Sequence, residues 1–148
     1  MKALTICNPY PYMIMDHSKR VENRTWATSY RGPLLIHAGK NRDWLQDGDF
    51  SIYPDMQFGF LLGAVEIVDC MSLEEISRGD YPPALNWLPE HEHTLGPYCW
   101  VLGDKVRRLK SPVPWKGAQG LWQIDDSDVM KWEWLEVTYE HEQWREAK

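Results

Sequence analysis

Seven stretches of the chain have the hydrophobic and polar pattern that is typical of β-strands. The most hydrophobic, F-G-F-L-L-G-A-V-E-I-V-D-C, predicts a central strand over residues 58–70. Gly59 and Gly63 indicate bulges or sharp bends within it. In Y-C-W-V-L, residues 98, 100 and 102 share one face because side chains alternate along a strand. The other predicted strands span residues 3–7, 20–26, 33–38, 98–102, 106–113 and 120–124.

Short helices are predicted between these strands. Residues 10–16 are apolar and follow Asn8-Pro9, so Asn8 is expected to cap a helix there. A second short helix is expected around Trp44. A third begins at Ser72, where Glu75 stands at the position that completes a capping box.

The acidic tail, residues 125–148, fits two patterns. Its first residues, 125–128, have the composition of a helix cap, whereas Leu135, Val137 and Tyr139 alternate as in a strand. We expect a helix over the last half of this tail.

The number and order of these elements predict one α+β domain. A chain of 148 residues has the length of a single domain, and no repeat or linker divides it. We therefore expect one domain over residues 1–148, with a core of about residues 3–124 and a C-terminal extension, residues 125–148.

Composition changes this picture little and excludes some classes of protein. The three cysteines, Cys7, Cys70 and Cys99, are far apart and form no C-x-x-C, so neither a disulfide framework nor a structural zinc site is expected. No apolar run approaches the roughly 20 residues that span a membrane, and the N-terminus lacks the apolar region of a signal peptide. We expect a cytoplasmic protein with no membrane partner.

Charge is segregated along the chain. The net charge is −6, but residues 17–42 sum to +5 and residues 104–116 to +4, so the other residues carry −15. A cationic face on an acidic body would attract phosphate locally and limit non-specific binding to nucleic acid. We predict that the two segments converge on one positive surface.

The first of these segments contains the candidate chemistry, H-S-K-R-V-E-N-R-T-W, at positions 17–26. If it is a strand, Arg20, Glu22, Arg24 and Trp26 share one face, and Lys19 lies at the strand entry. Glu22 is then expected to pair with Lys19 or Arg24, and the cations can meet an anionic ligand. The alternative is a solvated charged face that has no further role.

S-K-R-V-E-N-R resembles the G-x-K-x-x-E-x-R signature of the ASCH domain family. The upstream L-T-I-C-N-P-Y, the following R-G-P-L-L-I-H-A-G-K and the later K-G-A-Q-G-L-W resemble the same family in the same order, over about residues 3–124. The resemblance implies a PUA-like β-barrel with flanking helices. His17 stands where the signature has glycine, and a side chain disfavours the positive φ that glycine adopts easily.

The resemblance also implies functions. Some ASCH proteins are metal-independent amidohydrolases that act on acylated or modified cytidine through the motif lysine, and others are ribonucleases. A lysine acts as base or nucleophile only if its pKa falls. The amidohydrolases have threonine at the position of Glu22, so this chain departs from them there; Glu66 is our best candidate for a second carboxylate. The alternative is that Lys19 and Arg24 bind phosphate or pair with Glu22.

Several residues outside the motif are candidates for the same site. His37, at a strand end, has the right chemistry for acid–base catalysis near neutral pH, although histidines there are more often structural. We therefore predict a catalytic set of Lys19, Glu22, Arg24 and His37. Tryptophan rings offer stacking surfaces for bases, against the alternative of core packing. The predicted substrate-binding residues are Asn8, Trp26, Arg31, Lys40, Trp100 and Lys116.

His91 and His93 form a separate candidate. Two histidines at i and i+2 on an extended segment face the same way and could ligate zinc or nickel. The spacing specifies no third ligand, so we predict neither a metal nor a cofactor.

Three hypotheses about function remain open. The first is a module that binds RNA or a modified nucleoside in a cationic cleft without turnover. The second is an amidohydrolase acting on acylated or modified cytidine, and the third is a ribonuclease acting on single-stranded RNA. A closed pocket the size of one base favours the second hypothesis, and an open groove favours the other two.

Overall fold

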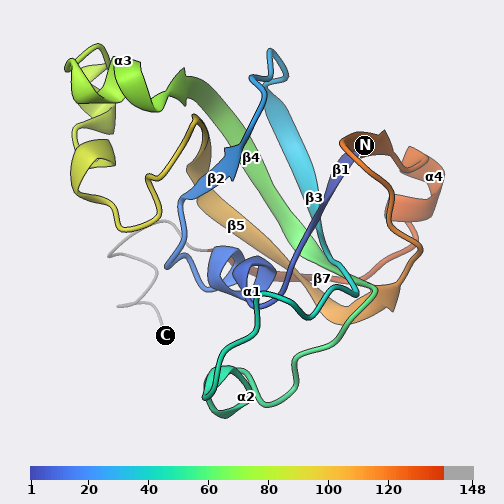
Figure 1. Cartoon of the computed structure of the whole chain (residues 1–148). Coiled ribbons are helices and arrows are strands. Elements are labelled where there is room, and N and C mark those ends of the chain that lie inside the picture. The colour runs from blue at the N-terminus through green and yellow to red at the C-terminus, as the bar shows by residue number, and fades with distance from the viewer. Residues whose placement is uncertain (139–148) are drawn as a thin grey trace.

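The computed structural model, which describes residues 1–138, has one mixed β-sheet curled into a half-barrel (Figure 1). The strand order is β2-β5-β4-β3-β1-β6, with β7 paired to β5. β1 and β3 run parallel, and the other pairs are antiparallel. The strands are β1 (Lys2–Ile6), β2 (Val21–Arg24), β3 (Gly32–Ala38), β4 (Phe60–Ser72), β5 (Tyr98–Pro114), β6 (Leu121–Gln123) and β7 (Trp134–Thr138). The predicted α+β class is confirmed.

β5 differs from the sequence-based expectation. The two strands predicted over residues 98–102 and 106–113 are one continuous strand of 17 residues. In its pairing with β4, Val65 is opposite Val106 and Ile67 is opposite Leu102, so a bulge in β5 takes up the intervening residues. Such a bulge bends a strand without ending it.

The predicted helices are confirmed in two of three places. α1 (Tyr10–Met15) follows Pro9, but Asn8 does not cap it; its side chain donates to the Gln57 carbonyl at 2.9 Å instead. α3 (Leu73–Ser77) begins with the expected capping box of Ser72 and Glu75. The remaining short helices are α2 (Asp49–Ile52), α4 (Asp126–Val129) and the 3₁₀ turns η1 (Pro83–Leu85) and η2 (Leu88–Glu90).

The helix predicted around Trp44 is wrong, and the helix predicted over the last half of the tail is contradicted only where that tail is described. The region of Trp44 forms turns, because the Asn41 and Asp49 side chains bond to the Asp43 and Gln46 backbone N–H groups and compete with helical bonds. Most of the described tail beyond α4 is not helical either: residues 134–138 form β7, which pairs with residues 107–109 of β5. The rest of that prediction, residues 139–148, lies outside the described part of the chain.

The main core fills the concave side of the half-barrel beneath α1. Trp100 is its largest fully buried side chain, packed with Leu4, Ile36, Ile67 and other aliphatic residues. A second cluster, around Leu88 and Cys99, lies under α3 and the 3₁₀ turns. No helix in the described part of the chain has the length and apolar character needed to cross a membrane.

Gly63 of β4 marks the closest approach in this core. A Cβ there would lie 2.3 Å from the Arg107 carbonyl oxygen of β5 and 2.6 Å from Met15 Sδ of α1. A Cβ at Gly103 would meet a side chain instead, with Val68 Cγ1 at 3.1 Å. Backbone cannot yield as a flexible side chain does, so of these two glycines Gly63 is the one fixed by packing.

We expect Gly63→Ala to lower the free energy of unfolding by roughly 2–4 kcal/mol, because the β4–β5 pairing must open to admit the methyl group. Urea denaturation measures this loss. Gly103→Ala is the matched control and should cost less than about 1 kcal/mol. Equal losses in the two variants would show that Gly63 is not packed as described.

Candidate functional site

The turn that leads into the motif keeps the conformation that glycine favours. His17 has a φ of 69°, in the left-handed region, and it is the one residue besides glycine with a positive φ in the described chain. Histidine is among the residues that tolerate this region better than most. The Ser18 and Lys19 backbone N–H groups both donate to the Met13 carbonyl at 3.0 Å. The turn therefore places Lys19 at the foot of α1 although the signature's glycine is replaced.

Glu22 is the centre of the site. Lys19 Nζ lies 2.7 Å from Glu22 Oε1, and Arg24 Nε lies 2.9 Å from Glu22 Oε2. Lys19 Nζ also donates to the Val21 carbonyl. Lys19 is 5% and Glu22 7% exposed. The predicted pairing of Glu22 is confirmed, and it involves both cations. We call Lys19, Glu22 and Arg24 together the motif site.

A chain of hydrogen bonds holds Arg24 to the other strands. Arg24 Nη2 donates to the Thr5 carbonyl of β1 at 3.1 Å, and Thr5 Oγ1 lies 3.1 Å from His37 Nδ1 of β3. His37 Nε2 lies 2.7 Å from the Trp115 carbonyl oxygen just beyond β5. A Cβ at Gly117 would lie 2.6 Å from Thr5 Oγ1, so only glycine fits beside these hydrogen bonds.

His37 is nearly fully buried and both of its ring nitrogens are engaged. A carbonyl oxygen can only accept, so Nε2 carries the proton and Nδ1 accepts from the Thr5 hydroxyl. Burial lowers the pKa of His37, while the bond to Trp115 acts in the opposite direction. This arrangement suits a neutral positioning residue; the catalytic role of His37 remains a prediction.

Loop 91–96 packs against the motif, which sequence reasoning missed. Asn23 alternates with Glu22 and faces this loop: its Nδ2 donates to the His93 carbonyl at 2.8 Å, and its Oδ1 accepts from the Leu95 and Gly96 N–H groups. His91 Nε2 accepts from the Arg20 backbone N–H at 3.0 Å. Strand alternation places Asn23 on the face opposite to Glu22. It does not predict that loop 91–96, about 70 residues away, packs against that face.

The metal hypothesis for His91 and His93 gains no support from the described residues. Within them, no group of three or more His, Cys, Asp or Glu side chains is placed to hold a metal ion. The nitrogen of His91 that accepts from Arg20 is already occupied, and the two rings lie 5.5 Å apart.

The predicted substrate-binding residues divide by location. Trp26 is 38% exposed and stacks edge-on against Trp100, which is fully buried and donates to the Trp26 carbonyl at 3.1 Å. Trp100 thus supports Trp26 from beneath. Arg31 turns toward Asp69, at 3.6 Å, and bonds to carbonyls of its own turn.

The remaining candidates lie elsewhere around the sheet. Asn8 is fully buried, and its Oδ1 has no hydrogen-bond partner among the described residues. Lys40 follows β3 and lies close to Gly59, whose carbonyl accepts from the Trp115 N–H; Lys116 follows Trp115. Glu66 lies opposite Pro33 in the β3–β4 register. Burial raises the pKa of Tyr30, and the charge of Glu66 acts in the same direction.

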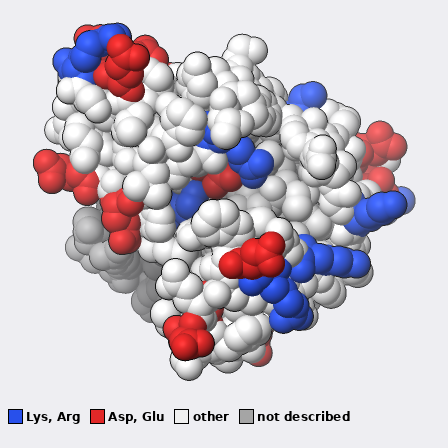
Figure 2. Space-filling view, viewed as in Figure 1, with Lys and Arg blue, Asp and Glu red and all other residues white. Residues whose placement is uncertain are grey.

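The two basic segments meet at two points. Arg20 pairs with Asp104, and the end of β3 meets the residues that follow β5 through His37 and Trp115. Figure 2 shows basic and acidic side chains together in a recess at the centre of this face, over β2, with further basic side chains lower in the view. Some cations of the two basic segments are paired: Arg31 with Asp69 and Lys110 with Glu133. One continuous cationic cleft therefore remains a prediction.

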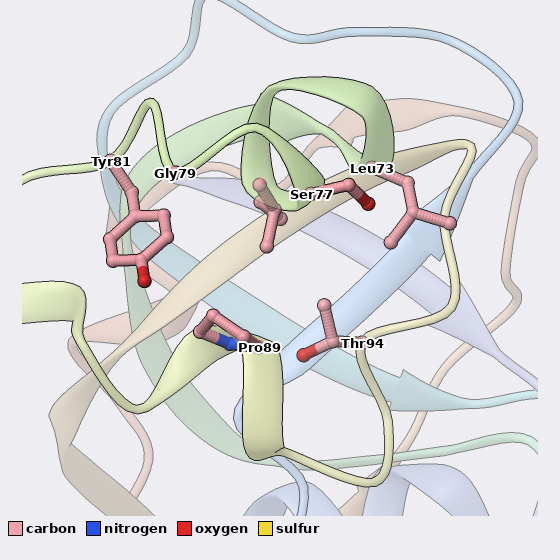
Figure 3. Close-up of a pocket in the computed structure, with 7 residues that line it drawn as sticks. Leu73, Ser77, Gly79, Tyr81, Pro89 and Thr94 are labelled. Carbon is pink, nitrogen blue, oxygen red and sulfur yellow. The ribbon is translucent and has the colours of Figure 1, made fainter.

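A separate pocket of about 250 Å³ lies between α3 and the loop that follows it. Figure 3 shows Tyr81, Pro89 and Thr94 facing Leu73 and Ser77 across it. None of the motif residues lines this pocket, so it is distinct from the motif site.

We expect Glu22→Gln to lower the free energy of unfolding by roughly 3–5 kcal/mol, because it leaves two largely buried cations without their carboxylate. Chemical denaturation of the variant and wild type measures the loss. Glu133→Gln is the matched control: its pair with Lys110 is exposed, so it should cost at most about 1 kcal/mol. A small loss in Glu22→Gln would mean that the pairing contributes little.

We expect stability to fall as the pH is lowered from about 6.5 toward 4. Burial, with the nearby charges of His93 and Arg20, lowers the pKa of His91 from 6.5 to about 4. Between these values the unfolded chain binds the proton and the folded chain does not, so acid favours unfolding. After allowance for partial exposure of the ring, the loss should be about 2 kcal/mol.

Urea denaturation at a series of pH values tests this dependence, and His91→Gln should flatten the profile. Burial also lowers the pKa values of His37 and His93, which add a slope of the same sign that this variant retains. An unchanged profile in His91→Gln would contradict the assignment.

Comparison with known proteins identifies the family. The ASCH domain model matches residues 4–144, nearly the whole chain. Activating signal cointegrator 1 of Homo sapiens is 24% identical over 136 residues, and its Mus musculus counterpart is 26% identical. Each match covers 83% of this chain but only 22% of the relative, so the chain spans about a fifth of the length of these proteins. Together with the PUA-like half-barrel, the match shows that this chain belongs to the ASCH domain family.

Proposed function

We propose that the protein binds single-stranded RNA, or a modified nucleoside within it, at the motif site. The observation that carries this proposal is the buried carboxylate of Glu22, which fixes two cations. Trp26, whose ring is 38% exposed, follows Arg24 by two residues in the chain. The cations supply hydrogen-bond donors, and the ring supplies a stacking surface of the kind that single-stranded nucleic acids use.

Arg24 is the group that meets the ligand's polar atoms. Its side chain is 24% exposed, and its Nε and Nη2 are turned inward to Glu22 and Thr5. Among the described residues Nη1 has no hydrogen-bond partner, so its two N–H groups can face a phosphate or a carbonyl oxygen. A guanidinium held by its other edge loses little entropy when it binds, because its orientation is already fixed.

Lys19 fits binding better than covalent catalysis. Its Nζ donates to both Glu22 and the Val21 carbonyl, so two of its N–H groups are engaged in holding the site together. A nucleophilic lysine must instead lose its proton. The hydrolase hypotheses, amidohydrolase on acylated or modified cytidine and ribonuclease on single-stranded RNA, are kept as outcomes of the same experiment.

Membership of the ASCH family supports this proposal, since nucleic-acid binding is what the family resemblance implies. The net charge of the whole chain is −6, and the residues outside the two basic segments carry −15. This distribution agrees with binding at one local site rather than with a general coating of nucleic acid. The activities of the longer relatives are not carried over, because this chain spans only 22% of them.

We expect Arg24→Lys to weaken binding of a fluorescein-labelled single-stranded RNA decamer by roughly 10- to 100-fold, because it removes the planar fork but keeps the charge. Fluorescence anisotropy at fixed salt measures the affinity. Lys110→Met is the matched control, since it removes a cation of β5 that pairs with Glu133 away from the motif. Equal affinities for Arg24→Lys and wild type would overturn the proposal.

Turnover is tested in the same samples. Wild type and Lys19→Met are incubated with acylated cytidines and with single-stranded RNA, and products are followed by chromatography. Binding without product supports the proposal. Product formed by wild type and lost in Lys19→Met, with its fold checked by circular dichroism, would replace binding by hydrolysis.

A further inference from the structure

Loop 91–96 forms a wall beside the motif site, and His93 lies on it. Asn23 fixes the loop backbone through its bonds to His93, Leu95 and Gly96, as described above. The charges of Lys19 and Glu22 both act on the His93 ring, so the ring lies near the motif site. A contact residue held on such a fixed loop is positioned before a ligand arrives.

One nitrogen of His93 is buried without a hydrogen bond. Its side chain is 12% exposed, and its Nε2 has no hydrogen-bond partner among the described residues. The Glu92 carboxylate lies 3.7 Å away, beyond hydrogen-bond distance. A buried polar atom without a partner is unfavourable, and a native structure that keeps one usually gives it a role.

His93 and Lys19 both lie against the ring of Tyr10. The His93 ring packs edge-on against Tyr10, with centroids 6.3 Å apart, and Lys19 Nζ lies 5.8 Å from the centroid of the same ring. Lys19 Nζ has three N–H groups, of which two reach Glu22 and Val21. The third N–H of Lys19 and the Nε2 of His93 are therefore two unused hydrogen-bonding groups around one aromatic ring.

We propose that His93 is a ligand-contact residue of the motif site, whose Nε2 bonds to the edge of a bound nucleobase; this inference rests on the proposed function. A nucleobase edge presents a carbonyl oxygen beside a ring nitrogen or an amino group. Lys19 can only donate and would meet the carbonyl, whereas a neutral imidazole nitrogen donates or accepts according to its tautomer. His93 thereby gives the site a means to select the base and not only the phosphate.

Two-bond ¹H–¹⁵N spectra of the wild-type histidine rings test this assignment directly. We expect the His93 Nε2 resonance to move on addition of uridine 5′-monophosphate or cytidine 5′-monophosphate. Ribose 5-phosphate, which lacks the base, should leave it in place. Movement with ribose 5-phosphate alone would overturn the inference, because the ring would then respond to phosphate.

His93→Phe keeps a ring against Tyr10 and removes the nitrogen. We expect it to weaken binding of the two nucleotides roughly 3- to 10-fold, the effect of one hydrogen bond, without weakening ribose 5-phosphate binding. His91→Gln is the matched control on the same loop: its amide carbonyl can still accept from the Arg20 N–H, and nucleotide affinity should not change.

The outcomes separate the two proposals. If wild type binds the nucleotides and Arg24→Lys weakens them, but the His93 resonance does not move and His93→Phe binds normally, only the inference about His93 fails. If wild type binds neither nucleotides nor RNA, the proposed function fails and the role of His93 fails with it.

Discussion

The buried carboxylate of Glu22 is the interaction on which the rest of the site depends. It is held between Lys19 and Arg24 at hydrogen-bond distance, with little access to water. Replacing every member of such a buried set of ion pairs by apolar residues of similar size often costs little, whereas removing one partner leaves an uncompensated charge. The arrangement therefore contributes less to net stability than to orientation, because each charged group is held by hydrogen bonds to its neighbours.

Hydrogen bonds connect the motif site to other strands of the sheet. Arg24 reaches β1 through the Thr5 carbonyl, Thr5 reaches β3 through His37, and His37 reaches the segment after β5 through the Trp115 carbonyl. These segments are far apart in sequence, and the sheet order brings them together. The network explains why a histidine and a glycine outside the motif, His37 and Gly117, matter for its geometry without any need for them to touch a ligand.

Local patterns in the sequence predicted what local forces decide. The capping box at Ser72, the apolar run of β4 and the pairing of Glu22 all depend on residues close together in the chain. The errors arise where distant pairing decides. β5 stays continuous because β4 accommodates its bulge, and residues 134–138 become a strand because β5 has an edge to pair with. The spacing of His91 and His93 alone suggests metal ligands, whereas the residues that hold their loop, Arg20 and Asn23, lie about 70 residues away in the chain.

β2 is short, so its two faces are closely linked. It has four residues, and its two faces have different tasks: Glu22 and Arg24 form the motif site, while Val21 and Asn23 hold the second core cluster and the loop. A strand this short cannot adjust one face without moving the other, since its side chains alternate along a single backbone. Loop 91–96 and the motif site are therefore positioned by the same four residues, because Asn23 bonds to the loop while Glu22 and Arg24 form the ion pairs.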